Sequence, residues 1–331
     1  MKKNGLLILV FVLVSSLLFS GCAYGAQIVA RMGHGAYPSN PCARACQHFI
    51  DLVEERTDGR VKIEFFHSLA LGDDAAMMEQ LINGTVEFVA PGAGAFGRYT
   101  PLLNVLQLPF LLNNYEKEFY VAQTKELQDI FAAMEPLLGL KILALHESGI
   151  RHLSNNIRPI QSFEDVRGLK LRTVPNQLMN DALQALGANP IAIGSFAEVY
   201  TGLQNRIMDG LEINKTSVYS QKFYEVLRYF TTVGLWPFPH ALTVNLAFFN
   251  SLSPEDQKIL IEAARESSEY NKSILEEAEE VATKTMIENG MEIIEISDVQ
   301  PFIDATKDIY EVYMSMDPLM RNFVEMARNL Q

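Results

Sequence analysis

The chain has 331 residues, of which 48% are hydrophobic and 20% are charged. This is the balance of a soluble globular protein with room for two domains, and it excludes intrinsic disorder, collagen and coiled coil. Forty acidic and 27 basic residues give a net charge of −13, so the chain has no general electrostatic attraction for nucleic acid or anionic lipid.

The first 25 residues have the layout of a secretory signal peptide. Two lysines precede an almost unbroken apolar run from Leu6 to Phe19, which is shorter than the roughly 20 residues that a membrane-spanning helix needs. The small residues that follow permit either ordinary cleavage before Ala26 or acylation of Cys22 in a sequence similar to a lipoprotein box. We therefore expect an exported, periplasmic protein, and lipidation at Cys22 stays open.

The other two cysteines, Cys42 and Cys46, are four residues apart in a predicted helix. A disulfide between them is conceivable in an oxidising compartment, but it would close a very small loop and constrain little. We favour two small buried thiols. Six histidines are scattered along the chain, and no Cys and His spacing is typical of zinc, so we expect neither a metal nor a cofactor.

From residue 27 onward, short apolar runs alternate with amphipathic stretches, which is typical of an α/β fold. The first block predicts strands at 28–32, 61–66, 86–90 and 140–146, and helices at 41–57, 72–82 and 116–134, the last ending before Pro136. The second block predicts strands at 151–154, 169–173, 192–193 and 208–212, and helices at 177–186 and 196–204.

The third block contains one unusually long helical stretch. Ser253 is a predicted N-cap, and residues 254–289 contain no glycine and no proline after Pro254. At about 1.5 Å per residue such a helix would be on the order of 54 Å long, which is more than one small lobe can use. We predict a single helix that packs on two lobes, and a break in its middle is the alternative.

Three glycines, Gly92, Gly94 and Gly97, spell G-x-G-x-x-G after a predicted strand. A dinucleotide site with this motif needs a helix whose N-terminus binds the pyrophosphate. Pro101 would break that helix, so we interpret the segment as a glycine-rich loop whose backbone approaches some other ligand closely.

Signatures of hydrolytic enzymes are missing from the sequence. It contains no G-x-S-x-G, H-E-x-x-H or Walker lysine motif. His146, Glu147 and Ser148 are three catalytic residue types in a row, but neighbours on a strand point to opposite faces and cannot form a relay. Nothing in the sequence requires an enzyme.

Arg151 and Arg172 each lie in an apolar strand pattern at the start of the second block. Leu169, Leu171 and Thr173 share one face of their strand, so Arg172 projects from the other. The planar guanidinium group matches a carboxylate with two parallel hydrogen bonds and keeps its charge when buried. Both arginines are therefore candidate carboxylate ligands, and the alternative is an arginine on the surface or paired with one of the many acidic residues.

Seven segments, in order, make the chain resemble the solute-binding subunits of tripartite ATP-independent periplasmic (TRAP) transporters. They are LALG at 69–72, LPFLL at 108–112, the segment around Arg151, GLKLRTVP at 168–175, ALGANP at 185–190, EVYTGLQ at 198–204 and MDGLE at 208–212. The resemblance covers essentially the whole mature chain. It implies a binding protein, not an enzyme, that captures an organic acid by lobe closure and delivers it to separate membrane permease subunits.

The resemblance implies an α/β, two-lobed periplasmic-binding fold of type II-like architecture, with mixed sheets flanked by helices and a long helix that spans both lobes. We expect residues 1–25 to be the signal peptide. Lobe I is expected to comprise 26–148 and about 240–275, and lobe II 149–239 and about 276–331.

The resemblance also implies the roles of three site residues. Arg172 corresponds to the main carboxylate clamp, and Arg151 occupies another position often found in the pocket. Phe196 matches an aromatic residue that commonly packs on the ligand.

Two further positions leave alternatives open. Where many members read Asp-Gly-x-Glu-Asn, this chain has Ile213 before Asn214, so either Asn214 reaches the ligand or Ile213 makes the pocket more apolar. Trp236, the only tryptophan, lies where the chain should cross between lobes, and is either a wall of the pocket or part of a rigid hinge.

The ligand itself is not identified by these residues. C4-dicarboxylates, sugar acids, keto acids and aromatic carboxylates all carry the group that Arg172 would bind. Two other functions use the same frame: a secreted enzyme with two lobes, and a receptor that presents its ligand to a sensor kinase.

Overall fold

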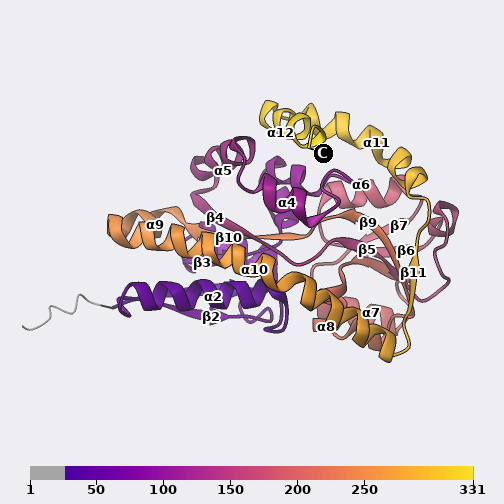
Figure 1. Cartoon of the computed structure of the whole chain (residues 1–331), viewed down its shortest axis with the longest axis horizontal. Helices are drawn as coiled ribbons and strands as arrows, with labels where there is room; N and C mark the ends of the chain where they lie inside the picture. The colour runs from indigo at the N-terminus through magenta and orange to yellow at the C-terminus, as the bar shows by residue number, and fades with distance from the viewer. Residues whose placement is uncertain (1–26, 331) are drawn as a thin grey trace, which may run out of the picture.

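The computed structural model describes residues 27–330, which form two mixed β-sheets flanked by helices (Figure 1). The expected signal peptide and Cys22 lie outside these residues. Within the described part of the chain, no helix is both long enough and apolar enough to cross a membrane.

The first sheet has the strand order β2-β1-β3-β10-β4. Strand β1 is parallel to β2 and β3, and β10 is antiparallel to β3 and β4. The strands are β1 (Ile28–His34), β2 (Val61–Phe66), β3 (Phe88–Ala90), β4 (Leu140–Glu147) and β10 (Pro239–Asn245), accompanied by helices α2 (Pro41–Arg56), α3 (Asp74–Ile82), α4 (Tyr115–Val121), α5 (Lys125–Leu138) and α9 (Leu246–Ser251).

The second sheet has the strand order β11-β9-β5-β8-β6-β7. Its central strand β5 is antiparallel to both neighbours, β8 and β9. The strands are β5 (Arg151–Asn155), β6 (Lys170–Thr173), β7 (Asn189–Ala192), β8 (Gly210–Ile213), β9 (Tyr229–Trp236) and β11 (Glu292–Glu295), accompanied by helices α6 (Gln177–Ala185), α7 (Phe196–Gln204) and α8 (Lys215–Ser220).

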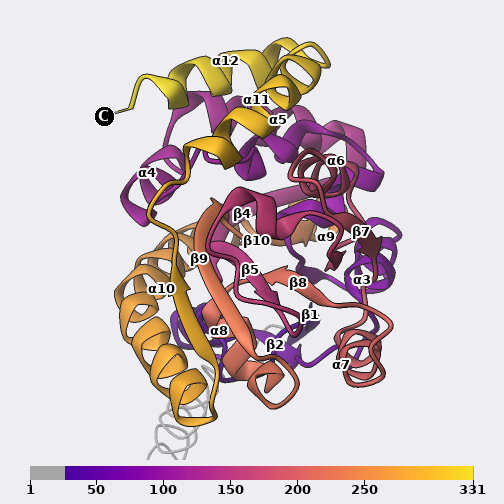
Figure 2. The same cartoon turned by 90° about the vertical axis from the view of Figure 1, so that its right-hand side faces the viewer.

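The chain passes between the two sheets through two short connections. Residues 148–150 lead from β4 to β5, and residues 237–238 lead from β9 back to β10. The C-terminal helices α11 (Gln300–Met314) and α12 (Pro318–Arg328) then return over the molecule, and α12 packs on α5 (Figures 1 and 2). Thus α12, which the sequence division places with lobe II, contacts a helix of the first block.

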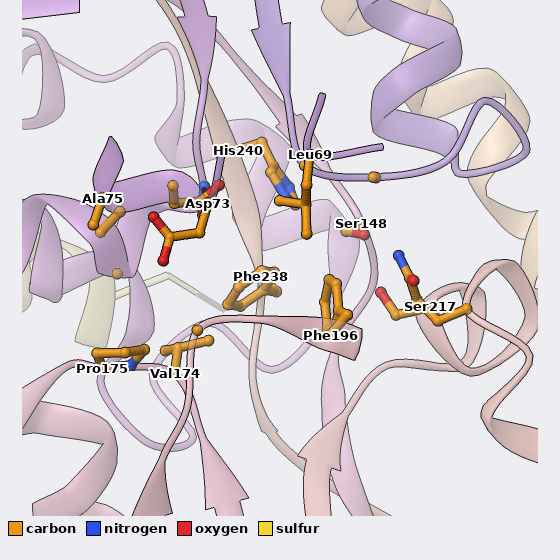
Figure 3. A pocket seen from close by; sticks show the side chains of 18 of the residues that line it. Leu69, Asp73, Ala75, Ser148, Val174, Pro175, Phe196, Ser217, Phe238 and His240 are labelled. Atoms are coloured by element: carbon orange, nitrogen blue, oxygen red, sulfur yellow. Dashed lines mark hydrogen bonds between the residues drawn. The ribbon is translucent and has the colours of Figure 1, made fainter. Parts of the chain in front are cut away.

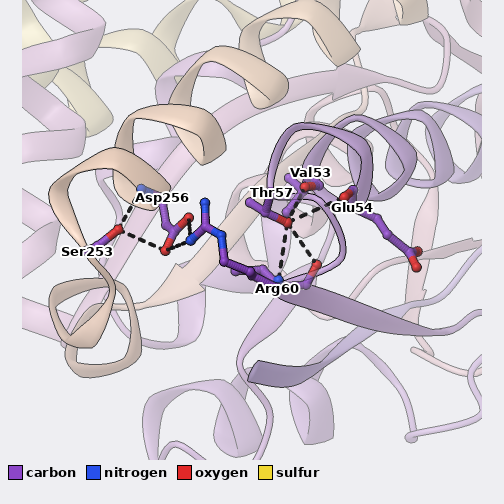
Figure 4. A network of polar contacts seen from close by, with 7 residues as sticks. Val53, Glu54, Thr57, Arg60, Ser253 and Asp256 are labelled. Atoms are coloured by element: carbon purple, nitrogen blue, oxygen red, sulfur yellow. Dashed lines mark hydrogen bonds and ion pairs between the residues drawn. The ribbon is translucent and has the colours of Figure 1, made fainter. Parts of the chain in front are cut away.

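The predicted long helix is confirmed as one unbroken element, α10 (Pro254–Glu288). It packs on α2 and β4 of the first sheet and on α8 and β11 of the second. Ser253 caps its first turn by accepting the N–H of Asp256 at 3.1 Å. The Asp256 carboxylate also accepts two hydrogen bonds from Arg60, at 2.7 and 2.9 Å, so the start of α10 is bound to the segment before β2 (Figure 4).

The prediction of one continuous helix at 116–134 that ends before Pro136 is wrong. The structure has two helices there, α4 and α5, separated at residues 122–124, and Pro136 lies inside α5. The helix ends instead at Gly139, which has a left-handed conformation with φ of 65°. A glycine adopts this conformation without steric cost and so provides a stronger stop than a proline near the last turn.

Candidate functional site

A pocket lies between the two sheets, and both contribute to its lining (Figure 3). The first sheet and its loops supply Asp73, Asp74 and His240, and the second supplies Arg172 and Phe196, among others. The two connections contribute Ser148 and Phe238. Any change in the angle between the sheets would therefore change the shape of this pocket.

Arg172 is a buried cation on the pocket surface. It lies on β6 with 1% of its surface exposed, and its Nε donates to the Ile193 carbonyl oxygen at 2.8 Å. Within residues 27–330 its Nη1 atom is buried without a hydrogen-bond partner. Burial lowers the pKa of Arg172 to about 10, so the side chain stays charged at neutral pH and can bind an anion.

Phe196 lies beside this cation, at the start of α7. Its ring centroid is 5.4 Å from Cζ of Arg172, and the ring lines the pocket. Ser195 caps the helix and fixes where Phe196 begins it. The structure therefore brings together Arg172 and Phe196, which the resemblance pairs as clamp and packing aromatic.

Arg151 is fully buried at the start of β5, but it is not a lining residue of the pocket. Its Nε donates to Glu212, and its Cζ lies 4.2 Å from the ring centroid of Phe238, which does line the pocket. Both Nη atoms of Arg151 lack a partner in the described part of the chain. Arg151 thus contacts the pocket wall, and Glu212 balances its charge.

Glu212 connects the two arginine strands. One carboxylate oxygen binds Arg151, and the other accepts the hydroxyl of Thr173, the residue after Arg172, at 3.1 Å. All three side chains are buried. Sequence reasoning used Glu212 only as part of a motif, although a buried acid on a strand next to an arginine strand is a signal for such a pair.

The other predicted site residues do not line the pocket. Ile213 and Trp236 are fully buried among core side chains. Asn214 is also buried, and its side-chain nitrogen and oxygen have no partner within residues 27–330. It lies against the first connection, because a Cβ atom on Gly149 would come within 3.2 Å of the Asn214 Cβ.

Two acidic residues that sequence reasoning missed, Asp73 and Asp74, lie at the start of α3 and line the pocket. Asp74 accepts the N–H of Gly92 at 3.1 Å, and burial raises its pKa to about 6. The signal available in the sequence was an acidic pair directly after a glycine, at a helix N-terminus where Asp is a preferred cap.

The glycine-rich segment does reach the pocket, since Gly92 and Gly94 line it. It forms a short 3₁₀ helix at Ala93–Arg98 rather than an open loop. Asn176, beyond β6, donates to the Gly94 carbonyl oxygen at 2.8 Å, and a Cβ atom on Gly97 would be 2.5 Å from the same amide nitrogen. A side chain at position 97 would therefore displace the Asn176 amide, which packs against this backbone.

Cys42 and Cys46 are buried free thiols on α2. Cys42 Sγ is 3.2 Å from Nδ1 of the lining residue His240. Burial raises the pKa of both thiols and lowers that of His240, so these groups are uncharged at neutral pH. In the described part of the chain no group of three or more His, Cys, Asp or Glu side chains is arranged to hold a metal ion.

The sequence model of bacterial extracellular solute-binding protein family 7 (DctP) matches residues 32–317. The 2,3-diketo-L-gulonate-binding periplasmic protein YiaO of Escherichia coli K12 is 33% identical over 287 residues, 87% of each chain. The C4-dicarboxylate-binding protein DctB of Bacillus subtilis 168 is 29% identical over 298 residues, 90% of this chain and 82% of that protein.

Solved structures show the same relationship in three dimensions. A TRAP periplasmic solute-binding protein from Roseobacter denitrificans, with bound β-D-glucuronate, superposes with a TM-score of 0.87 at 29% identity and covers 92% of this chain and 100% of that chain. A second one, from Sulfitobacter sp. NAS-14.1 with bound β-D-galacturonate, has a TM-score of 0.86 at 28% identity, with 91% and 100% covered.

Proposed function

The chain belongs to bacterial extracellular solute-binding protein family 7 and is a TRAP periplasmic solute-binding protein, and on this premise we propose that Arg172 binds the carboxylate of its organic-acid ligand. The observation that carries the proposal is the buried Nη1 of Arg172, which lies next to Phe196 on the pocket surface and has no hydrogen-bond partner in the described part of the chain. A buried charged donor without a partner is costly, and a carboxylate is the anion whose geometry fits it best.

The charges around the pocket favour a ligand with one carboxylate and several hydroxyl groups. Glu212 already balances Arg151, so the lining cations left to bind an anion are the buried Arg172 and the exposed Arg98, whose charge is screened by solvent. Asp73 and Asp74 line the same pocket and would repel a second carboxylate, but their oxygens can accept hydrogen bonds from hydroxyl groups. The hexuronates bound to the two neighbouring structures have this composition.

Lobe closure would strengthen the contact with Arg172. Closure excludes water, and charge pairs interact more strongly in the lower dielectric that results. A ligand that binds the closed form better shifts the population toward it. We propose that the permease subunits of a TRAP transporter recognise this closed form and receive the ligand from it.

A calorimetric titration tests the ligand class. We expect D-glucuronate or D-galacturonate to bind the purified mature protein at least about tenfold more tightly than succinate. Tighter binding of succinate would contradict the proposed charge balance. The enzyme alternative requires turnover, so recovery of unchanged hexuronate after prolonged incubation and denaturation supports a binding protein, whereas a product would contradict it.

A further inference from the structure

One buried carboxylate, that of Glu147, binds both connections between the sheets. Its Oε1 accepts the N–H of Gly149, in the connection from β4 to β5. The same atom accepts the N–H of Phe238, in the connection from β9 to β10, at 3.1 Å. Because Ser148 and Phe238 line the pocket, the position of this oxygen helps to set the position of the pocket walls.

The long helix holds the backbone of Glu147 in place. Asn271 on α10 donates its Nδ2 to the Glu147 carbonyl oxygen at 3.1 Å and accepts the Glu147 N–H at 2.6 Å. Both residues are buried. Helix α10 therefore fixes the backbone of Glu147, while the two connections bind its carboxylate. A change in the angle between the sheets would move these connections.

A second buried acid, Glu118 on α4, lies within hydrogen-bonding reach of Glu147. The Oε2 atoms of Glu118 and Glu147 are both buried, and neither has another partner within residues 27–330. Among the ion pairs of residues 27–330, none includes the carboxyl group of Glu118 or of Glu147.

The other titratable groups around the pair are the Cys42 thiol of α2, Tyr115 of α4 and Glu279 of α10, which accepts the Tyr115 hydroxyl. The cations nearest to them are paired with other acids: Lys215 lies 4.0 Å from Glu279, and Arg151, which contacts the Phe238 ring, binds Glu212. Burial raises the pKa of both carboxyls, and the charge of Glu147 raises that of Glu118 further. Two buried carboxylates in contact, neither of which forms an ion pair with a cation of residues 27–330, cannot both stay ionised.

We propose that Glu118 and Glu147 share one proton, which Glu118 donates to Oε2 of Glu147, and that this pair is the positioning element that holds the two connections together. The shared proton follows from the burial of the two carboxyl groups and the contact between them, whereas the role in ligand binding rests on the proposed function. With Glu118 protonated, Glu147 remains an anion whose other oxygen accepts the two backbone N–H groups.

The effect of pH follows from the direction of the shift. Because the pKa of Glu118 is higher in the folded chain than in the unfolded one, the stabilisation is complete at acid pH and is lost as the pH rises through the folded value. Glutamine at position 118 donates an N–H in place of the O–H and cannot lose it. The variant Glu118→Gln should therefore remove the alkaline loss that the wild-type protein shows.

Infrared spectroscopy detects the proton directly. At about pH 8, where Asp74 and exposed carboxyls are ionised, we expect the wild-type protein to show the C=O band of a protonated carboxylic acid. The band should be absent from Glu118→Gln and should persist in the control Asp256→Asn, a buried acid that pairs with Arg60 instead. The absence of the band from the wild-type protein would overturn the shared proton, whether or not any variant folds.

Trp236 reports on the positioning role, because it is the only tryptophan and directly precedes the second connection. We expect Glu118→Ala to shift its emission, because Glu147 loses the donor at its Oε2, and Glu118→Gln to restore the wild-type emission and to flatten the fall of Tm with rising pH. Identical emission and pH profiles in all three proteins would overturn the positioning role. If D-glucuronate fails to bind the wild-type protein, the ligand class is contradicted while these ligand-free measurements still decide this proposal.

Discussion

At the scale of single residues, the pocket is organised around Arg172, whose Nε donates to the Ile193 carbonyl oxygen and whose buried Nη1 has no hydrogen-bond partner among residues 27–330. Truncation of one partner of a buried, hydrogen-bonded charge pair typically costs about 2–5 kcal/mol. We therefore expect Arg172→Ala to weaken hexuronate binding by that amount in calorimetry. The control Lys170→Ala changes an exposed cation two residues earlier on the same strand; an equal loss there would contradict a specific clamp.

Asp74 gives the pocket a pH dependence near its pKa of about 6. Burial raises that pKa above the unfolded value, so the stabilisation is present at acid pH and is lost as the pH rises through about 6. We expect Asp74→Asn to raise Tm relative to the wild-type protein above pH 6 and to have little effect near pH 4, in a thermal-shift series. If Tm changes with pH in the same way in both proteins, the pKa of Asp74 is not raised in the folded protein.

At the scale of elements, α10 is bound to the first sheet by the Arg60 and Asp256 pair at its N-terminus (Figure 4). The Asp256 side chain is 4% exposed, so Arg60→Ala leaves a buried carboxylate whose remaining partner among residues 27–330 is the Ser253 hydroxyl. We expect a loss of about 1–3 kcal/mol of unfolding free energy in urea and an unchanged ligand affinity, because neither residue lines the pocket. A loss of affinity without a loss of stability would contradict this assignment.

At the scale of the whole molecule, Asn176 joins the second block to the first beside the pocket, next to the lining residues Gly94 and Pro175. Its Nδ2 donates to the Gly94 carbonyl oxygen and to Asn104 Oδ1, and its Oδ1 caps α6. Asn176→Ser keeps an N-cap oxygen, but its side chain is too short for the two contacts with the first block. We expect it to weaken ligand binding by about 0.5–1.5 kcal/mol for each lost bond, mainly through faster dissociation.

The control for this prediction is Asn180→Ala, which removes an amide from α6 that donates only within its own segment, to the Asn176 carbonyl oxygen. Stopped-flow fluorescence of Trp236 with D-glucuronate measures the dissociation rate. Equal dissociation rates for Asn176→Ser and the wild-type protein would show that this bridge does not stabilise the closed form.

The sequence by itself determined the features that depend on neighbouring residues. The cap Ser253, the continuity of α10 and the face of the strand from which Arg172 projects follow from local propensity and from the periods of helix and strand. Even here a local rule failed at Pro136, because the stop at Gly139 was the stronger one.

Only the tertiary structure decided which side chains face the pocket. Asp74 lies there because α3 packs beside Gly92, and Trp236 and Ile213 do not, because their strands turn those side chains into the core. Glu147 binds two connections that are about 90 residues apart in the chain. The physical reason is that burial, pairing of charges and shared protons depend on which distant segments meet, and no pattern within a single segment contains that information.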